Sequence, residues 1–189
     1  MYVPEYPILT ERLLLRPITA ADAPAMLRYK SDADNVRYVP YGPLTLAEVE
    51  ERIATRWSGT SFEAQDDAVC LAVEERATGR LVGDVVLFWR SENDREGEVG
   101  YILDPVASGN GYAAEAVRAL LAVGFDGLGL HRIAARIDER NSASARVVER
   151  LGFRREARLV ESSWFKGEWT TLLVYALLEQ EWRSPIIEE

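Results

Sequence analysis

Apolar and polar residues are distributed along the chain in a way that predicts seven short strands. Runs rich in β-branched and other apolar residues, bounded by proline, glycine or polar clusters, are typical of strands. Such runs cover Arg12–Pro17, Ala68–Glu74, Leu81–Arg90, Glu98–Leu103, His131–Ile137, Phe153–Ser162 and Trp169–Leu178. Turns at Thr78-Gly79 and at Lys166-Gly167 join the second strand to the third and the sixth to the seventh.

Helical spacing of apolar residues and capping residues predict four helices between these strands. The helices run from Thr19 or Asp22 to about Lys30, from the capping box Thr45–Glu48 to about Trp57, from Gly111 over about four turns, and over Ser142–Leu151, capped by Asn141 and ended by Gly152. The order β-α-α-β-β-β-α-β-α-β-β predicts an α/β (α+β) fold with a mixed central sheet and helices on both of its faces.

Length and composition narrow the class of protein. The 189 residues suit a single domain, with a core from about residue 8 to residue 183. With 22 Lys plus Arg against 31 Asp plus Glu, the net charge of −9 repels polyanions, so neither nucleic acid nor an anionic membrane is expected as a partner. The single Cys70 lies in an apolar run and fits a reducing compartment. No signal peptide or spanning segment is visible, and we expect a cytoplasmic protein.

The segment Ser108–Val117 (SGNGYAAEAV) joins a predicted strand to a predicted helix. Gly109 and Gly111 accept positive φ and let a ligand approach the backbone, and a helix that begins here leaves its first N–H groups free. These features describe either an anion site made of main-chain atoms or a turn that binds nothing. The third glycine of a dinucleotide-binding loop is missing, and so is the Lys-Ser/Thr ending of a P-loop.

This segment resembles motif A of the GNAT N-acetyltransferases, written Gln/Arg-x-x-Gly-x-Gly/Ala. Gly111 matches the motif glycine and Ala113 the closing small residue, whereas Ser108 stands where glutamine or arginine is usual. The resemblance extends along nearly the whole chain. The segments LTERLLLRPIT (9–19), NSAS (141–144), VVERLGFRRE (147–156) and LLVYALLEQEW (172–182) are similar to the branch that contains the ribosomal-protein N-terminal acetyltransferases.

The resemblance implies a sheet that splays between its fourth and fifth strands, here Glu98–Leu103 and His131–Ile137, with acetyl-coenzyme A bound in the gap. It implies main-chain contacts to the cofactor from the fourth strand, the glycine loop and the start of the last helix. The residues concerned are Tyr101, Ile102, Leu103, Ser108, Gly109, Asn110, Gly111, Tyr112, Ala113, Ala114, Asn141 and Ser144. With Ser108 in place of a longer side chain, we expect the pyrophosphate to depend on the N–H groups of Gly109 to Ala114.

Three residues are candidates for catalysis. Some related enzymes place a tyrosine seven residues after the helix-capping asparagine, where it protonates the leaving thiolate, but that position is Val148 here. Ser144 is the remaining candidate for this role, although serine is also common near helix caps. Glu98 is the first candidate for the base and Glu161 the second, and either can be an ordinary exposed charge. No cluster with metal-ligand spacing occurs, so no metal is expected.

These observations favour an enzyme that transfers acetyl from acetyl-coenzyme A to a primary amine, either a peptide N-terminus or a small molecule. The alternative is a module that binds coenzyme A without turnover, as a sensor or partner protein. We expect two segments to wall the acceptor site: the loop with Asn35, Arg37, Tyr38 and Tyr41, and the turn from Trp164 to Trp169. The aromatic residues in these segments can equally be core or dimer contacts. The chain can be a monomer or a homodimer, because apolar edges on the last strands permit a dimer without requiring one.

Overall fold

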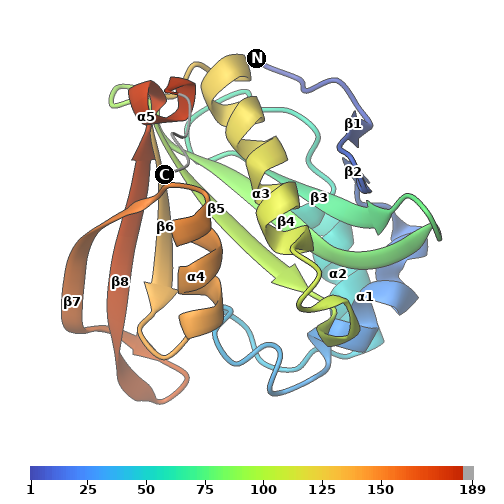
Figure 1. Cartoon of the computed structure of the whole chain (residues 1–189). Coiled ribbons are helices and arrows are strands. Elements are labelled where there is room, and N and C mark those ends of the chain that lie inside the picture. Colours follow the sequence, from blue (N-terminus) through green and yellow to red (C-terminus); the bar gives the residue numbers. More distant parts are fainter. Residues whose placement is uncertain (185–189) are drawn as a thin grey trace.

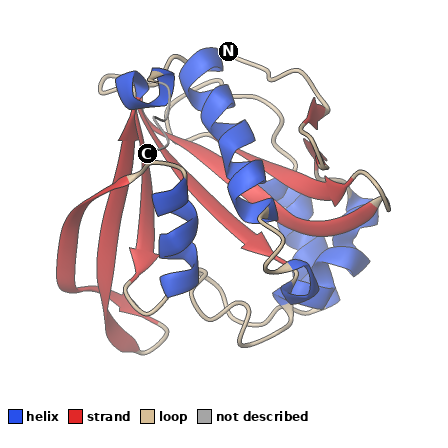
Figure 2. Ribbon diagram, viewed as in Figure 1, coloured by secondary structure: helices blue, strands red, loops and turns tan. Residues whose placement is uncertain are grey.

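A mixed sheet of eight strands runs through the molecule, with helices on both of its faces (Figures 1 and 2). In this computed structural model, which describes residues 1–184, the strands are β1 (Ile8–Leu9), β2 (Leu13–Pro17), β3 (Ala68–Glu75), β4 (Arg80–Ser91), β5 (Glu96–Leu103), β6 (Arg132–Asp138), β7 (Arg154–Phe165) and β8 (Glu168–Leu178). The helices are α1 (Ala23–Lys30), α2 (Leu46–Arg52), α3 (Tyr112–Ala122), α4 (Ser142–Arg150) and α5 (Glu179–Arg183).

The sheet has the strand order β1-β2-β3-β4-β5-β6-β8-β7, and only β5 and β6 run parallel to each other. These two strands pair through three residues each, Glu96–Glu98 with Arg132–Ala134, and then diverge. Figure 1 shows the resulting gap between the light-green β5 and the orange β6, below the point where they pair. This confirms the predicted splay between the fourth and fifth of the expected strands, which are β5 and β6 here.

The alternation of side chains along the strands builds a separate core on each face of the sheet. Leu71 and Val73 of β3 belong to the core under α3 and α4, whereas Cys70 and Ala72 of the same strand belong to the core under α1 and α2. This alternation is what the two-residue period of a strand requires. Figure 2 shows α3 and α4 in front of the sheet and α1 and α2 behind it. The gap between β5 and β6 therefore lies beside the N-terminal ends of α3 and α4.

The elements differ from the sequence prediction mainly at their ends. The strand β1 and the helix α5 were not predicted, because two and five residues are too few to give a periodic pattern. Helices α2 and α3 each continue into a five-residue π-helical turn, which gives both helices close to the predicted length. The strand β7 extends to Phe165 rather than Ser162, across a bulge between Leu159 and Ser163.

A buried ion pair lies in the core behind the sheet. The Lys30 ammonium at the end of α1 is 2.7 Å from Oδ1 of Asp84 on β4, and the Lys30 side chain is only 1% exposed. The hydroxyl of Tyr29 donates to the same carboxylate oxygen at 2.7 Å, and Trp57 faces the ammonium at 4.3 Å. Burial opposes the charge on Lys30, but Asp84 outweighs it and raises the pKa of the ammonium. The pair joins α1 to the middle of the sheet.

Candidate active site

The loop before α3 holds both glycines in conformations that other residues rarely adopt. A short 3-10 turn, Pro105–Ala107, follows β5, after which Gly109 and Gly111 have φ angles of 83° and 77°. Gly111 is the residue that caps α3. Glycine reaches this left-handed region without the steric cost of a Cβ atom, as the sequence predicted for both positions.

Six consecutive backbone N–H groups, those of Gly109 to Ala114, are hydrogen-bonded to no acceptor within residues 1–184. The first bond of the helix runs from the N–H of Glu115 to the carbonyl of Gly111 at 3.1 Å. A helix start leaves its first four N–H groups free, and the positive end of the helix dipole faces the same side. The loop extends this set, so the main chain alone can bind an anionic group of several oxygens.

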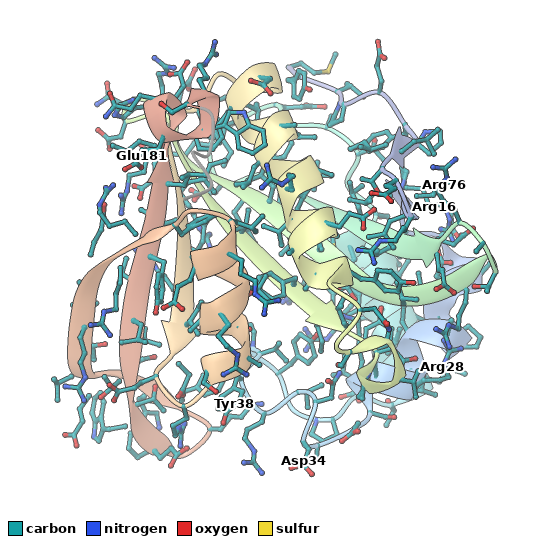
Figure 3. All side chains as sticks on the ribbon, in the orientation of Figure 1. Arg16, Arg28, Asp34, Tyr38, Arg76 and Glu181 are labelled. Atoms are coloured by element: carbon teal, nitrogen blue, oxygen red, sulfur yellow. The ribbon has the colours of Figure 1, made fainter. Side chains whose placement is uncertain are left out.

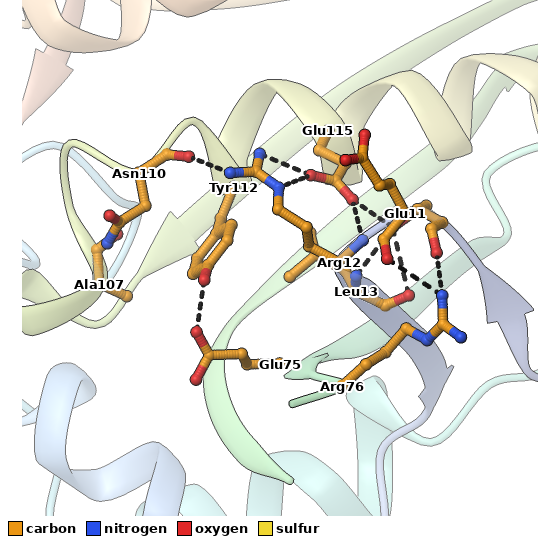
Figure 4. A network of polar contacts seen from close by, with 10 residues as sticks. Glu11, Arg12, Leu13, Glu75, Arg76, Ala107, Asn110, Tyr112 and Glu115 are labelled. Atoms are coloured by element: carbon orange, nitrogen blue, oxygen red, sulfur yellow. Dashed lines mark hydrogen bonds and ion pairs between the residues drawn. The ribbon is translucent and has the colours of Figure 1, made fainter. Parts of the chain in front are cut away.

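Side chains from the N-terminal segment hold this loop in place (Figure 4). The Arg12 guanidinium donates from Nη1 to the carbonyl of Asn110 at 2.8 Å and from Nε to the Glu115 carboxylate at 2.8 Å. Glu115 also accepts from the backbone N–H of Arg12 and from the hydroxyl of Thr10. Burial works against ionisation of Glu115, but the bonds from Thr10 and Arg12 lower the pKa of the carboxyl. Tyr112 donates its hydroxyl to Glu75 on β3.

The splay leaves one edge of β5 without a partner strand. Val99–Leu103 pair with β4 on one side, but β6 has already diverged on the other. At the end of the strand the carbonyl of Leu103 accepts a bond from Nδ2 of Asn35, at 3.1 Å. The backbone groups of Tyr101 point toward the gap and have no strand partner, so a ligand in the gap can bond to them, whereas those of Ile102 point toward β4.

The N-terminus of α4 borders the other side of the gap. Asn141 caps the helix as predicted, because its Oδ1 accepts from the N–H of Ser144 at 3.2 Å. Tyr101 crosses from β5 and donates its hydroxyl to the carbonyl of Ser144 at 2.9 Å. Burial raises the pKa of Tyr101 to about 12, so the hydroxyl stays protonated as the donor. The structure thus brings Tyr101, Asn141 and Ser144 together, and the Ser144 hydroxyl is bonded to no other group in the described chain.

Glu98 lies at the point where the two strands separate. Its Oε2 is 3.1 Å from Nε of Arg90 and 3.7 Å from Nε of Arg136, while Oε1 has no partner within residues 1–184. A cavity of about 370 Å³ is lined by Arg90, Glu96, Gly97, Glu98, Ala134 and Arg136. The two arginines hold the carboxylate through one oxygen and leave the other without a partner in the described chain.

The second candidate base lies elsewhere in the sheet. Glu161 is exposed in the bulge of β7, with φ at 44°, and its N–H donates to the hydroxyl of Thr171. Because β6 and β8 lie between β5 and β7 in the sheet, the structure does not bring Glu161 and Glu98 together.

The two segments expected to wall an acceptor site contact each other. Lys166, in the turn between β7 and β8, donates from Nζ to the carbonyls of Val36 and Arg37 at 2.6 and 3.1 Å. Tyr38 lies below α4 in Figure 3, with the Arg140 guanidinium 5.9 Å from its ring centre. Tyr41 instead packs beside Lys30 in the core behind the sheet, so it is not a wall residue.

Sequence reasoning missed Arg12, Glu115 and the side chain of Tyr101. Arg12 was read only as the first residue of a strand, and Glu115 as a polar position of a helix. Arg12 and Glu115 are 103 positions apart, so no local sequence pattern links them. The sequence places each residue in its own element but does not show that the two elements meet. Within residues 1–184 no three His, Cys, Asp or Glu side chains are placed to hold a metal ion, and no helix is long and apolar enough to cross a membrane.

The family is decided by comparison with known proteins. A family model described as an acetyltransferase (GNAT) domain matches residues 12–154. The chain belongs to the GNAT acetyltransferase family. An uncharacterized N-acetyltransferase of Bacillus subtilis, YnaD, is 33% identical over 175 residues, which cover 93% of this chain and 98% of that protein. These matches confirm the resemblance seen in the sequence motifs.

Solved structures of GNAT proteins have the same fold. A GNAT-family acetyltransferase from Bacillus anthracis superposes with a TM-score of 0.82 at 30% identity, covering 96% of this chain and 100% of that one. A spermidine N-acetyltransferase from Vibrio cholerae, solved with CoA and spermine, superposes with a TM-score of 0.76 at 22% identity, covering 93% and 100% of the two chains. As a GNAT family member, the chain is an acyltransferase that depends on acetyl-coenzyme A.

Proposed function

We propose that this GNAT protein transfers acetyl from acetyl-coenzyme A to a primary amine, by direct attack in a complex that holds both substrates. The observation that carries the proposal is the run of six free N–H groups from Gly109 to Ala114, placed beside an open gap in the sheet. A phosphate group needs several donors at one place, and an extended thiol arm needs unpaired backbone groups along a channel. The loop and the gap meet both needs.

The cofactor residues proposed here follow the sequence expectation. The N–H groups of Gly109 to Ala114 would hold the pyrophosphate. The backbone groups of Tyr101 and the N–H of Leu103 would bond the pantetheine arm, whereas the backbone of Ile102 is paired with β4. Asn141 caps the helix through Oδ1, so its Nδ2 takes no part in the cap and can donate to the same arm. The N–H of Ser108 already donates to the carbonyl of Pro105 and its side chain is short, so Ser108 would be a peripheral contact at most.

Bound acetyl-coenzyme A supplies a thioester carbonyl for attack by an amine. The ammonium form of the acceptor first releases one proton to solvent. The neutral nitrogen then forms the new C–N bond and loses a second proton, the C–S bond breaks, and the sulfur takes up a proton. Glu98 would accept the proton from nitrogen, directly or through water, at its unpartnered Oε1. The Ser144 hydroxyl, in the first turn of α4, would donate to the sulfur. The tyrosine that has this role in related enzymes is replaced by the fully buried Val148, which lies one turn later in the helix. Glu161 would stay outside this step.

The acceptor is proposed to be a cationic primary amine. The resemblance to the ribosomal-protein branch supports a peptide α-amine, and the Vibrio cholerae protein of the same fold acts on spermidine, a polyamine. The net charge of −9 would attract either amine in its protonated form. The contact between the β7–β8 turn and the loop around Val36 would form the entrance through which the acceptor reaches Glu98.

The function is tested by measuring thiol release from acetyl-coenzyme A over a panel of amines. The panel contains peptides that differ in their first residue, spermidine, spermine and an aminoglycoside. We expect turnover with one of these classes, and none with the N-acetylated form of the same compound, which serves as the matched control. Calorimetry that finds no binding of acetyl-coenzyme A at high micromolar concentration would overturn the proposal.

Replacing Ser144 with alanine is expected to lower kcat about tenfold, because the leaving sulfur loses a hydrogen-bond donor in the transition state. The KM for acetyl-coenzyme A should change little, since the backbone of α4 and the Asn141 cap remain. Steady-state kinetics at saturating amine measure both constants. Ser142→Ala is the matched control, because Ser142 is exposed on the same helix turn, and an unchanged kcat in Ser144→Ala removes Ser144 from the mechanism.

A further inference from the structure

We propose that Arg12 and Glu115 are positioning residues for the cofactor loop, and that they replace the side chain that Ser108 lacks. The inference rests on the proposed use of this loop to bind coenzyme A. Arg12 precedes β2 at the N-terminal end of the chain, whereas Glu115 lies in the first turn of α3. Figure 4 shows the guanidinium between the Glu115 carboxylate and the carbonyl of Asn110.

The bond to Asn110 fixes the peptide plane at the centre of the loop. The Asn110–Gly111 peptide is trans, because the only cis peptide bond of the described chain joins Tyr6 and Pro7. In a trans peptide the carbonyl oxygen and the following N–H point in opposite directions. With the Asn110 carbonyl held toward Arg12 at 2.8 Å, the N–H of Gly111 must point away from the N-terminal segment, as a free donor.

Without that bond the plane is free to turn over. Gly109 and Gly111 lie on either side of Asn110, and glycine has the lowest barrier to large changes of φ and ψ. A turned plane would point the Asn110 carbonyl oxygen into the anion site, where it repels phosphate, and would remove the Gly111 N–H. Arg12 prevents this, and Glu115 holds Arg12 because Nε and Nη2 of the guanidinium both contact Oε2 of the carboxylate.

The attachment of Arg12 extends into the sheet. Glu115 accepts from the backbone N–H of Arg12 at 2.8 Å and from the Thr10 hydroxyl at 2.6 Å, so the carboxylate holds both the side chain and the backbone of the segment. The Arg12 side chain remains 45% exposed, with its carbon Cζ 4.9 Å from the ring centre of Tyr112. The Arg12 guanidinium therefore joins three elements: the N-terminal segment, the loop and α3.

The test measures coenzyme A affinity by calorimetry, kcat and both KM values, and the melting temperature, in Arg12→Ala, Arg12→Lys and Glu115→Gln. Arg12→Ala should weaken coenzyme A binding and raise the KM for acetyl-coenzyme A about tenfold or more, the effect of losing charge-assisted hydrogen bonds, with the KM for the amine unchanged. Arg76→Ala is the matched control, because Arg76 binds the carbonyls of Thr10 and Glu11 in the same segment but does not contact the loop.

Two variants separate positioning from direct contact with the phosphates. A lysine at position 12 keeps the charge but cannot bridge Glu115 and the Asn110 carbonyl with a planar fork, so it should restore little of the affinity. Glu115→Gln should also weaken binding. If Arg12 instead contacted phosphate directly, lysine would restore most of the affinity, and removing the negative charge of Glu115 would strengthen binding.

The inference is overturned by either of those results, or by wild-type affinity in a folded Arg12→Ala variant. It is also overturned if Arg76→Ala weakens binding as much as Arg12→Ala, since both variants would then act only through the segment. Failure of the wild-type protein to bind coenzyme A would instead contradict the proposed function. The two failures are therefore distinguishable in the same set of measurements.

Discussion

Replacing Gly111 with valine is expected to weaken coenzyme A binding about a hundredfold or more. The φ angle of 77° is one that a β-branched residue adopts only at considerable cost, so the loop should leave its present conformation. The rearrangement would move the N–H groups of Gly111 and its neighbours away from the pyrophosphate. Losing two bonds to a charged group, each contributing about 1.5–3 kcal/mol, corresponds to this loss of affinity. Calorimetric titration with coenzyme A measures it.

A second glycine, Gly129, provides a control that separates the effect of backbone strain from the effect of losing the anion site. Gly129 has a φ of 66° and open space where a Cβ would be placed, but it lies in the turn before β6, away from the cofactor loop. Gly129→Val should therefore lower the melting temperature by a comparable amount and leave coenzyme A affinity near that of the wild type. Unchanged affinity in Gly111→Val would contradict the assignment of this loop to the pyrophosphate.

Replacing Lys30 with methionine is expected to lower the free energy of unfolding by about 3–5 kcal/mol, because it leaves the Asp84 carboxylate buried without its cation. The Tyr29 hydroxyl and the Cys70 thiol still donate to this carboxylate, but these neutral donors do not replace an ammonium at 2.7 Å. Urea denaturation, followed by circular dichroism, measures the change.

The control for this variant lies two residues earlier on the same helix. Arg28 pairs with Asp104 at 3.4 Å, but its side chain is 50% exposed. Asp104 is nearly buried, but half of the Arg28 side chain is in contact with water, which screens the pair, so Arg28→Met should cost less than Lys30→Met. If both variants lower the free energy of unfolding by the same amount, burial of the Lys30–Asp84 pair does not make it more important for stability than the Arg28–Asp104 pair.

Local features of the sequence were sufficient to predict most of the fold. Strand β4, helix α3 and the Asn141 cap each depend on a few neighbouring residues, and the structure confirms them. The positive φ angles of Gly109 and Gly111 also follow from local chemistry. The splay between β5 and β6 is different, because no hydrophobic pattern encodes where two parallel strands separate. It was predicted from resemblance to the family alone.

The features that sequence reasoning missed are pairs of residues far apart in the chain. Lys30 and Asp84 lie in different elements, and nothing near either residue shows that they meet in the core. The same holds for Arg12 with Glu115 and for Tyr101 with Ser144. Such pairs depend on how elements pack, which a single sequence does not state.

The gap between β5 and β6 also affects how this protein avoids aggregation. An unpaired strand edge can add a strand from another molecule, which is why exposed edges are a risk for folded proteins. Here unpaired backbone groups are presented inside the sheet, between two strands of the same chain that converge at Glu98 and Ala134. A second strand cannot run along a gap that closes at one end, whereas a thin flexible ligand can enter it. Because the gap closes at one end, its unpaired backbone groups are a shorter and less accessible template for an added strand than an open sheet edge would be.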